Sequence, residues 1–158
     1  MPTIVPLTAD ILVTAPCWAA EPDAEVLVQR AIEAAARQTS ADGAEVAIVL
    51  TDDSGIRSLN RDWRGIDKPT NVLSFPAAKK PARGREPRML GDIAIAYETT
   101  RREAESENKP FAHHLSHLAV HGFLHLVGYD HENDADAETM ESLERSILAG
   151  LGVPDPYA

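Results

Sequence analysis

The sequence predicts a single domain of the α+β (mixed α/β) class, and three observations lead to this prediction. The chain has 158 residues, the usual length of one domain, and a chain of this length can fold without a disulfide or a metal. Its one cysteine, Cys17, excludes a disulfide framework. Short strand-like segments alternate with helical patterns, which is typical of a mixed α/β domain. We therefore assign residues 1–158 to one domain.

The first third of the chain has strand patterns on both sides of a helix. Thr3–Thr8 and Ile11–Thr14 favour short strands. Over Asp23–Gln38 the apolar residues recur at helical spacing, and Asp23 is of a type that caps a helix N-terminus. Glu45–Thr51 is an almost continuous apolar run, which predicts a strand buried on both faces.

The rest of the chain continues this alternation. A short helix opens at Asp52–Ser54, and a strand over Val72–Phe75 is followed by a loop rich in proline, glycine and basic residues, Ala77–Arg88. The pattern then predicts a strand over Asp92–Ala96. Three helices follow, over Glu98–Asn108, Pro110–Val127 and Asp134–Leu151.

Charge is distributed unevenly along the chain. The formal net charge is −10, which argues against indiscriminate binding of nucleic acid. Residues 57–88, however, contain nine basic and three acidic residues and so carry +6, which leaves −16 for the remainder. Such a segment is either a solvated loop or a surface that binds a polyanion.

Neither a secretory leader nor a membrane span is expected. The N-terminal stretch has no basic leader and is broken by Pro2, Pro6 and Pro16. No apolar run approaches the ~20 residues that cross a bilayer as a helix. We therefore expect a cytoplasmic protein.

Three of the six histidines have the spacing of metal ligands. His121 and His125 are four residues apart, which puts both rings on one face of a helix. His131 can join them only if the chain turns after His125, and Gly128 suits that turn because glycine readily takes the left-handed conformation that ends a helix. The sequence thus predicts a metal site formed by His121, His125 and His131.

Three histidine ligands leave one coordination position open, as is usual in catalytic zinc sites. A water bound there would have a pKa of about 7 and could act as a nucleophile. Three imidazoles suit zinc but also nickel, copper or iron. Of the other histidines, His117 is interpreted as a core residue or a support for the ligands, and His113 and His114 as surface or packing residues.

The same histidine spacing occurs in a superfamily of zinc peptidases, whose H-E-x-x-H motif supplies a glutamate as general base. That position is Gly122 here, and glycine carries no proton. Peptidase chemistry would therefore need a base from outside the motif.

A second group of candidates binds phosphate rather than metal. An arginine offers a planar fork that matches phosphate oxygens, and a lysine adds a point charge. Hydroxyl and amide groups nearby offer neutral hydrogen bonds. The group consists of Arg64, Lys68, Thr70, Asn71 and Ser74. For Thr70 and Asn71, local turn chemistry after a proline is an equally good interpretation.

Three stretches of the chain, in this order and in a chain of this size, resemble the motifs of the YbeY family. They are WRGIDKPTNVLSFP (Trp63–Pro76), LGDIAI (Leu90–Ile95) and HGFLHLVGYDH (His121–His131). The resemblance extends from about Ser54 to the last helix, whereas the first fifty residues agree only in general pattern.

The resemblance implies a fold, an activity and partners. The fold is a four-stranded mixed sheet with about five or six helices and a cleft at the metal. The activity is that of a single-strand-specific, metal-dependent endoribonuclease, with the metal, usually zinc, on His121, His125 and His131 and an important arginine at Arg64. The implied role is rRNA processing at the 3′ end of 16S rRNA and ribosome quality control, with the small ribosomal subunit and an Era-type GTPase as partners.

On this hypothesis the reaction is metal-assisted cleavage of an RNA phosphodiester. Arg64 offsets charge that develops on the phosphate, a role in which one donor can contribute ~3–4 kcal/mol. Asp92 and Asp130 are candidates for orienting the ligands, because they lie near the motifs in the sequence. The nucleophile is either metal-bound water or the 2′-hydroxyl of the RNA. The alternatives are a zinc peptidase and a non-catalytic ribosome-assembly factor with a structural metal.

Overall fold

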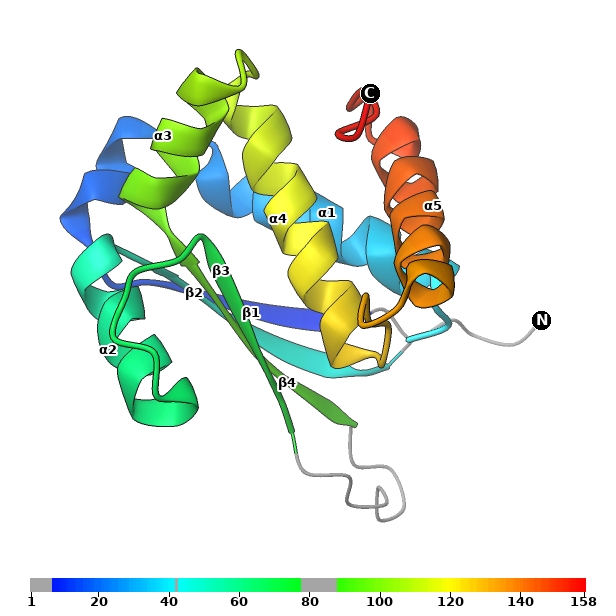
Figure 1. Ribbon diagram of the computed structural model, residues 1–158, viewed down its shortest axis with the longest axis horizontal. Helices are drawn as coiled ribbons and strands as arrows, with labels where there is room; N and C mark the ends of the chain where they lie inside the picture. Colours follow the sequence, from blue (N-terminus) through cyan, green and yellow to red (C-terminus); the bar gives the residue numbers. More distant parts are fainter. Residues whose placement is uncertain (1–6, 42, 78–87) are drawn as a thin grey trace.

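The computed structural model describes residues 7–41, 43–77 and 88–158, which form a four-stranded sheet with helices on both faces (Figure 1). The strands are β1 (Thr8–Val13), β2 (Glu45–Thr51), β3 (Val72–Pro76) and β4 (Met89–Ala96). A short 3-10 helix, η1 (Pro16–Ala20), precedes the α-helices α1 (Ala24–Gln38), α2 (Asp53–Arg64), α3 (Tyr97–Ser106), α4 (Phe111–Leu126) and α5 (Asp134–Gly150). The predicted α+β class and the four-stranded mixed sheet are confirmed.

The sheet is mixed because one edge strand runs against the others. Its order is β1-β2-β4-β3, with β1, β2 and β4 parallel and β3 antiparallel to β4. In this register Ser74 of β3 lies opposite Ile93 of β4, a fully buried residue of the main core. Ser74 therefore faces the side of the sheet that α4 covers.

The two faces of the sheet are covered by different helices. On one face α4 packs against β3 and β4 and also against α1, α3 and α5 (Figure 1). The strands contribute a row of buried residues to this main core, namely Val46, Ile48, Leu50, Ile93 and Ile95. On the other face, the Ile56 side chain of α2 forms a smaller cluster with Leu73, Ala94 and Ala96. The central position of α4 explains why its sequence is the most apolar of the helices.

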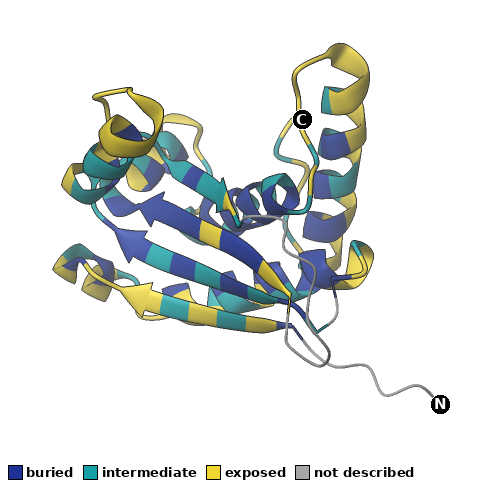
Figure 2. Cartoon of the chain, turned by 90° about the horizontal axis from the view of Figure 1, so that it is seen from below, coloured by how far each residue is buried: buried dark blue, intermediate teal, exposed yellow. Residues whose placement is uncertain are grey.

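Three details differ from the sequence-based expectation. β1 is one continuous strand rather than two pieces, and residues 3–6 of the first piece lie outside the described residues. β2 alternates between buried and half-buried residues instead of being buried on both faces (Figure 2), because α2 covers only part of the second face. Asp23 precedes α1, but its side chain makes no capping hydrogen bond.

Part of the predicted basic loop cannot be compared with the structure. Residues 78–87, four of which are basic, lie outside the described residues. Across the described ranges, no helix is long and apolar enough to cross a membrane. The elements that frame the site below are all within these ranges.

Local capping fixes the ends of the helices that carry the candidate residues. Gly65 takes the left-handed conformation (φ 71°) and ends α2 directly after Arg64. Gly128 also has a positive φ (105°), as predicted for the turn after α4. At the start of α5, the Asn133 side chain accepts a hydrogen bond from the Asp136 amide at 2.9 Å. His131 therefore lies in a short link between two fixed helix ends.

Candidate metal centre

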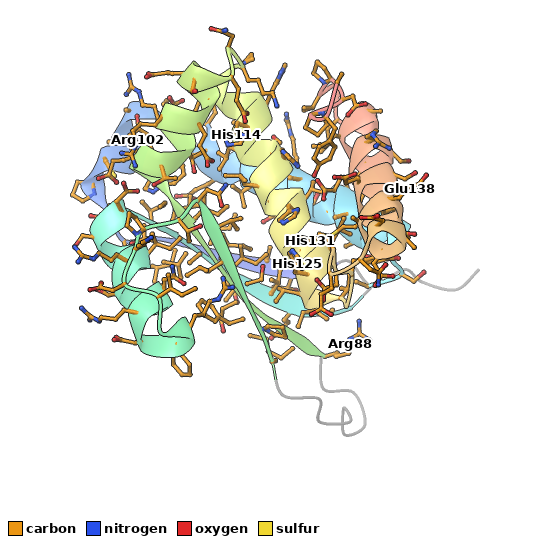
Figure 3. All side chains as sticks on the ribbon, in the orientation of Figure 1. Arg88, Arg102, His114, His125, His131 and Glu138 are labelled. Atoms are coloured by element: carbon orange, nitrogen blue, oxygen red, sulfur yellow. The ribbon has the colours of Figure 1, made fainter. Side chains whose placement is uncertain are left out.

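The three motif histidines come together at the C-terminal end of α4. His121 and His125 project from one face of α4, and the turn at Gly128 returns His131 to them. The Nε2 atoms of His121 and His125 are 3.1 Å apart, and one nitrogen from each of the three rings lies within 4.8 Å of the others. Figure 3 shows His125 and His131 near this end of α4, with His114 near the opposite end.

The donor geometry suits a shared metal ion. Two nitrogens bound tetrahedrally to zinc at ~2.0–2.1 Å lie about 3.3 Å apart, close to the 3.1 Å between His121 and His125. The Nδ1 atom of His125 lies 3.0 Å from the backbone oxygen of Tyr129, which fixes that ring and leaves Nε2 for a metal. Burial, together with the imidazoles of His121 and His131, lowers the pKa of His125 and favours the neutral form that a metal requires.

A buried glutamate on α5 supports this group from behind. Glu144 has no exposed surface, and its Oε1 lies 3.0 Å from Nδ1 of His121. Its Oε2 lies 2.6 Å from Nε2 of His117 and accepts a hydrogen bond from the Tyr157 hydroxyl at 2.8 Å. Burial by itself raises the pKa of Glu144, but the hydrogen bonds from His117 and His121 outweigh it and lower the pKa to about 2. Glu144 is therefore a carboxylate at neutral pH.

Sequence reasoning did not find Glu144, although the pattern contained a signal. The apolar residues of α5 recur at helical spacing and form one stripe, which consists of Met140, Leu143, Ile147, Leu148 and Leu151. Glu144 lies four residues after Met140 and three before Ile147, so it falls within that apolar stripe. A charged residue in the stripe of a helix that packs on a core needs a buried partner.

The remaining histidines of α4 have distinct surroundings. His117 contacts Glu144 and borders the cleft. Of its two predicted roles, a core residue or a support for the metal ligands, the second agrees with this position. His114 is almost fully buried and its Nε2 lies 2.9 Å from a carboxylate oxygen of Glu103 on α3. His113 does not border this cleft. The predicted packing role of His114 thus includes a specific polar contact.

Arg64 and the three histidines line the same cleft, which has a volume of about 850 Å³. Asn71 and Ser74 also line this cleft, but their polar atoms already have partners in the protein. Asn71 donates to Glu103 at 2.9 Å and accepts from the Val72 amide, and Ser74 donates to the carbonyl of Gly122 on α4 at 2.8 Å. The local turn interpretation of Asn71 agrees with this arrangement.

Lys68 and Thr70 do not line the cleft. The Lys68 side chain is exposed, and its backbone carbonyl accepts a hydrogen bond from the Asn60 side chain at 2.9 Å. The contact of Lys68 and Thr70 with substrate remains a prediction. For Lys68, such a contact would require RNA that extends beyond the cleft.

The two aspartates that were candidates for orienting ligands lie in different places. Asp130 lines the cleft and accepts a hydrogen bond from the His131 amide at 2.7 Å. Asp92 instead lines a separate hollow with Trp63 and Phe75, on the face of the sheet away from α4. The suggestion for Asp92 is therefore wrong, because alternate residues of a strand point to opposite faces of the sheet.

Packing gives a reason for glycine at position 122. A Cβ atom there would lie 3.1 Å from Ile93 Cγ2 and 3.2 Å from both Ser74 Oγ and Val72 Cγ2. Gly122 thus allows α4 to approach β3 and β4 closely, and any side chain at this position would require these neighbouring side chains to move by a few tenths of an ångström.

Comparison with known proteins adds a family to this geometry. A family model described as endoribonuclease YbeY matches residues 17–152. The chain is 66% identical to "Endoribonuclease YbeY" of Rhodopseudomonas palustris (strain BisB18), over 100% of this chain and 96% of that protein. It is 67% identical to the protein of the same name from Bradyrhizobium diazoefficiens, over 98% of this chain and 86% of that protein.

A solved structure supports the fold independently of these sequences. The solution structure of TM1509 from Thermotoga maritima superimposes with a TM-score of 0.56, at 22% identity, over 92% of each chain. Identity at this level shows a shared fold and carries no information on activity.

Proposed function

The chain belongs to the endoribonuclease YbeY family, and from this premise we propose that it cleaves single-stranded RNA with a metal ion held by His121, His125 and His131. Membership of the family makes the protein an RNA-cleaving hydrolase. The observation that carries the rest is the convergence of three imidazole nitrogens in one cleft that Arg64 also lines. We propose zinc as the metal, with nickel as the alternative, because three neutral imidazoles suit both.

Different residues of the site would have different roles in RNA cleavage. A bound metal would supply a Lewis acid and an open coordination position at the three histidines. Arg64 would pair with the non-bridging oxygens of the scissile phosphate and offset the charge that develops there. Glu144 and the Tyr129 carbonyl keep the rings of His121 and His125 oriented. The nucleophile is either water or the 2′-hydroxyl of the RNA.

We further propose the biological role that the family implies. In this role the protein, as a single domain of residues 1–158, matures 16S rRNA at its 3′ end and removes defective ribosomes. Its partners would be the small ribosomal subunit and an Era-type GTPase, and its compartment the cytoplasm where ribosomes are made. The family assignment supports this role, and rRNA end-mapping in cells that lack the protein would test it.

Two alternatives have less support. A zinc peptidase would need a general base, and the position that supplies it in such enzymes packs here against the sheet as Gly122. A non-catalytic ribosome-assembly factor would be favoured by a fourth ligand that closes the coordination sphere. Among the described residues, no fourth residue completes this group, and a second possible group, His117, His121 and Glu144, shares only His121 with it.

The decisive experiment compares wild type with His125→Ala and with a matched control, His113→Ala, on the same helix but outside the cleft. We expect stoichiometric metal and cleavage of single-stranded RNA for wild type and the control, and loss of both for His125→Ala. Cleavage by metal-free His125→Ala would contradict the proposal. The ends of the products identify the nucleophile, since 2′,3′-cyclic phosphate ends would exclude attack by water.

A further inference from the structure

The environment of Glu144 is unusual for a buried carboxylate. The side chain is completely buried, and both its oxygens are engaged, Oε1 by His121 and Oε2 by His117 and Tyr157. None of these three partners is a lysine or an arginine. A buried carboxylate without a formal cation is costly unless neutral donors or a metal nearby compensate its charge. Because Glu144 contacts the candidate metal ligand His121, its burial at this position indicates a role in the metal site.

The contact with Glu144 determines which nitrogen of His121 can bind a metal. Nδ1 of His121 lies 3.0 Å from Oε1 of Glu144, and because carboxylate oxygens accept hydrogen bonds from N–H groups, this geometry points to a proton on Nδ1. The lone pair is then on Nε2, the atom that lies 3.1 Å from Nε2 of His125. A carboxylate behind a ligating histidine also makes the ring a stronger donor to the metal.

The two ligands of α4 are oriented by different kinds of acceptor. His125 is held by a backbone carbonyl, that of Tyr129, which no substitution removes. His121 is held by a side chain from another helix, α5. The orientation of His121 therefore depends on how firmly Glu144 itself is held.

The segment after α5, residues 151–158, holds Glu144 in place. Tyr157 donates its hydroxyl to Oε2 at 2.8 Å, and its ring packs edge-on against His117. The segment is anchored at two further points, because Lys109 donates to the Pro156 carbonyl at 3.0 Å and Arg145 of α5 forms an ion pair with Asp155 at 3.4 Å. The Arg145 guanidinium lies 5.8 Å from the centre of the Tyr157 ring. This segment thus covers the carboxylate on its solvent side.

From these contacts we propose that Glu144 and Tyr157 are positioning residues of the metal centre, with Glu144 fixing His121 in the Nδ1–H form and Tyr157 fixing Glu144. The proposal rests on the metal site proposed above but goes beyond it, because it assigns a role to α5 and to the segment that follows. It also gives His117 a role, as the third donor that satisfies the buried carboxylate.

The test measures zinc(II) affinity directly, by competition with a chromophoric chelator, for wild type, Glu144→Gln and Tyr157→Phe. The control is Glu138→Gln, an exposed glutamate of the same helix that is labelled in Figure 3. Loss of a group behind a metal ligand typically costs 10–100-fold in affinity, and we expect a loss in about this range for Glu144→Gln. Tyr157→Phe keeps the carboxylate, so its loss should be smaller but larger than that of the control.

A second measurement separates positioning from a merely structural role. Nitrogen chemical shifts of the His121 ring in the metal-free protein report its tautomer, and we expect the Nδ1–H form in wild type and a mixture in Glu144→Gln. Zinc affinity within twofold of wild type in both variants, with an unchanged His121 tautomer, would overturn the proposal. Unfolding of Glu144→Gln would leave the decision to Tyr157→Phe, which removes only a hydroxyl.

Failure of the proposed function would look different. If wild type binds zinc but cleaves no RNA, and the two variants still lose zinc affinity, the positioning roles stand and the endoribonuclease proposal fails. If His125→Ala binds zinc as tightly as wild type, the metal site itself is wrong, and the positioning roles fall with it.

Discussion

The residues that line the cleft differ in how firmly their side chains are held by contacts within the protein. On the side formed by α4 and α5, Nδ1 of His121 contacts Glu144 and Nδ1 of His125 contacts the Tyr129 carbonyl. The Glu144 carboxylate is fully buried. Elsewhere in the cleft lining, Arg64 is exposed at the end of α2, and no described residue makes a hydrogen bond or ion pair with its guanidinium. Its helix neighbours Arg57 and Arg61 are instead paired with Asp67 and Asp62.

The difference reflects what each group of residues would bind. A metal ion requires ligand atoms at fixed distances, so the rings that hold it must be oriented before it arrives. A phosphate presents several equivalent oxygens, and an arginine side chain can adjust to meet them. The guanidinium of Arg64 is thus available to a substrate without breaking a contact with any described residue.

The largest expected effect concerns Arg64 itself. We expect Arg64→Ala to lower kcat for RNA cleavage by about 10²–10³-fold, because one positioned donor to the developing charge is lost. Metal content should not change, since Arg64 is not one of the candidate ligands His121, His125 and His131. The measurement is single-turnover cleavage together with metal analysis, and Arg64→Lys, which keeps the charge but not the fork, should recover part of the rate. Full activity of Arg64→Ala would show that Arg64 takes no part in RNA cleavage.

The next largest effect tests how tightly α4 packs against the sheet. Because a Cβ at position 122 would lie 3.1–3.2 Å from Ile93, Ser74 and Val72, Gly122→Ala should lower the free energy of unfolding by the ~1–3 kcal/mol typical of overpacking. Gly150→Ala is the control, since its added Cβ meets no atom within 4 Å and alanine favours the helix. Urea denaturation measures both. Equal stability of the two variants would mean that α4 is not tightly packed on the sheet.

A smaller effect concerns how α2, and with it Arg64, is anchored. The Asp53 carboxylate accepts hydrogen bonds from the Thr99 amide and hydroxyl of α3, and Arg102 donates to it at 2.8 Å. Burial raises the pKa of Asp53, but the hydrogen bonds from Thr99 and Arg102 outweigh it and hold the pKa below its ordinary 3.8. Asp53→Asn should therefore lower the free energy of unfolding by about 1 kcal/mol at neutral pH.

The pH dependence of this effect has a definite sign. A carboxyl whose pKa is lowered in the folded state contributes stability above its unfolded pKa, and this contribution is lost as the pH falls through the folded pKa. The difference between wild type and Asp53→Asn should hence shrink as the pH falls below 3.8. Asp23→Asn is the control, since Asp23 is exposed and makes no capping bond. A difference that stayed constant down to the acid transition would refute the assignment.

The smallest effect is expected at Lys68, which is exposed and outside the cleft. If Lys68 contacts one phosphate of a single-stranded RNA, Lys68→Ala should reduce the slope of log affinity against log salt by about 0.7. Cleavage at saturating RNA should stay within about twofold of wild type, because the contact is remote from the scissile phosphate. Binding isotherms over a salt series measure the slope. An unchanged slope would remove Lys68 from the predicted RNA-binding residues.

The sequence by itself determined the class of fold and the set of candidate ligands. The spacing of His121 and His125 within one helix, and the glycine that allows His131 to return, are local features. The helical period and the conformational freedom of glycine are enough to predict them. Arg64, in contrast, became a candidate through its phosphate-binding side chain and the family resemblance, and it precedes the glycine that ends α2.

Only the tertiary structure decided which residues from other elements join the site. Glu144 is 23 residues from His121 and Tyr157 is 40 residues from His117 along the chain, yet they contact one another because α5 and the following segment pack on α4. Asp92, close to the motifs in sequence, points to the opposite face of the sheet. Sequence spacing fixes proximity within one turn of a helix or along one strand, whereas contact between elements depends on how their buried faces pack.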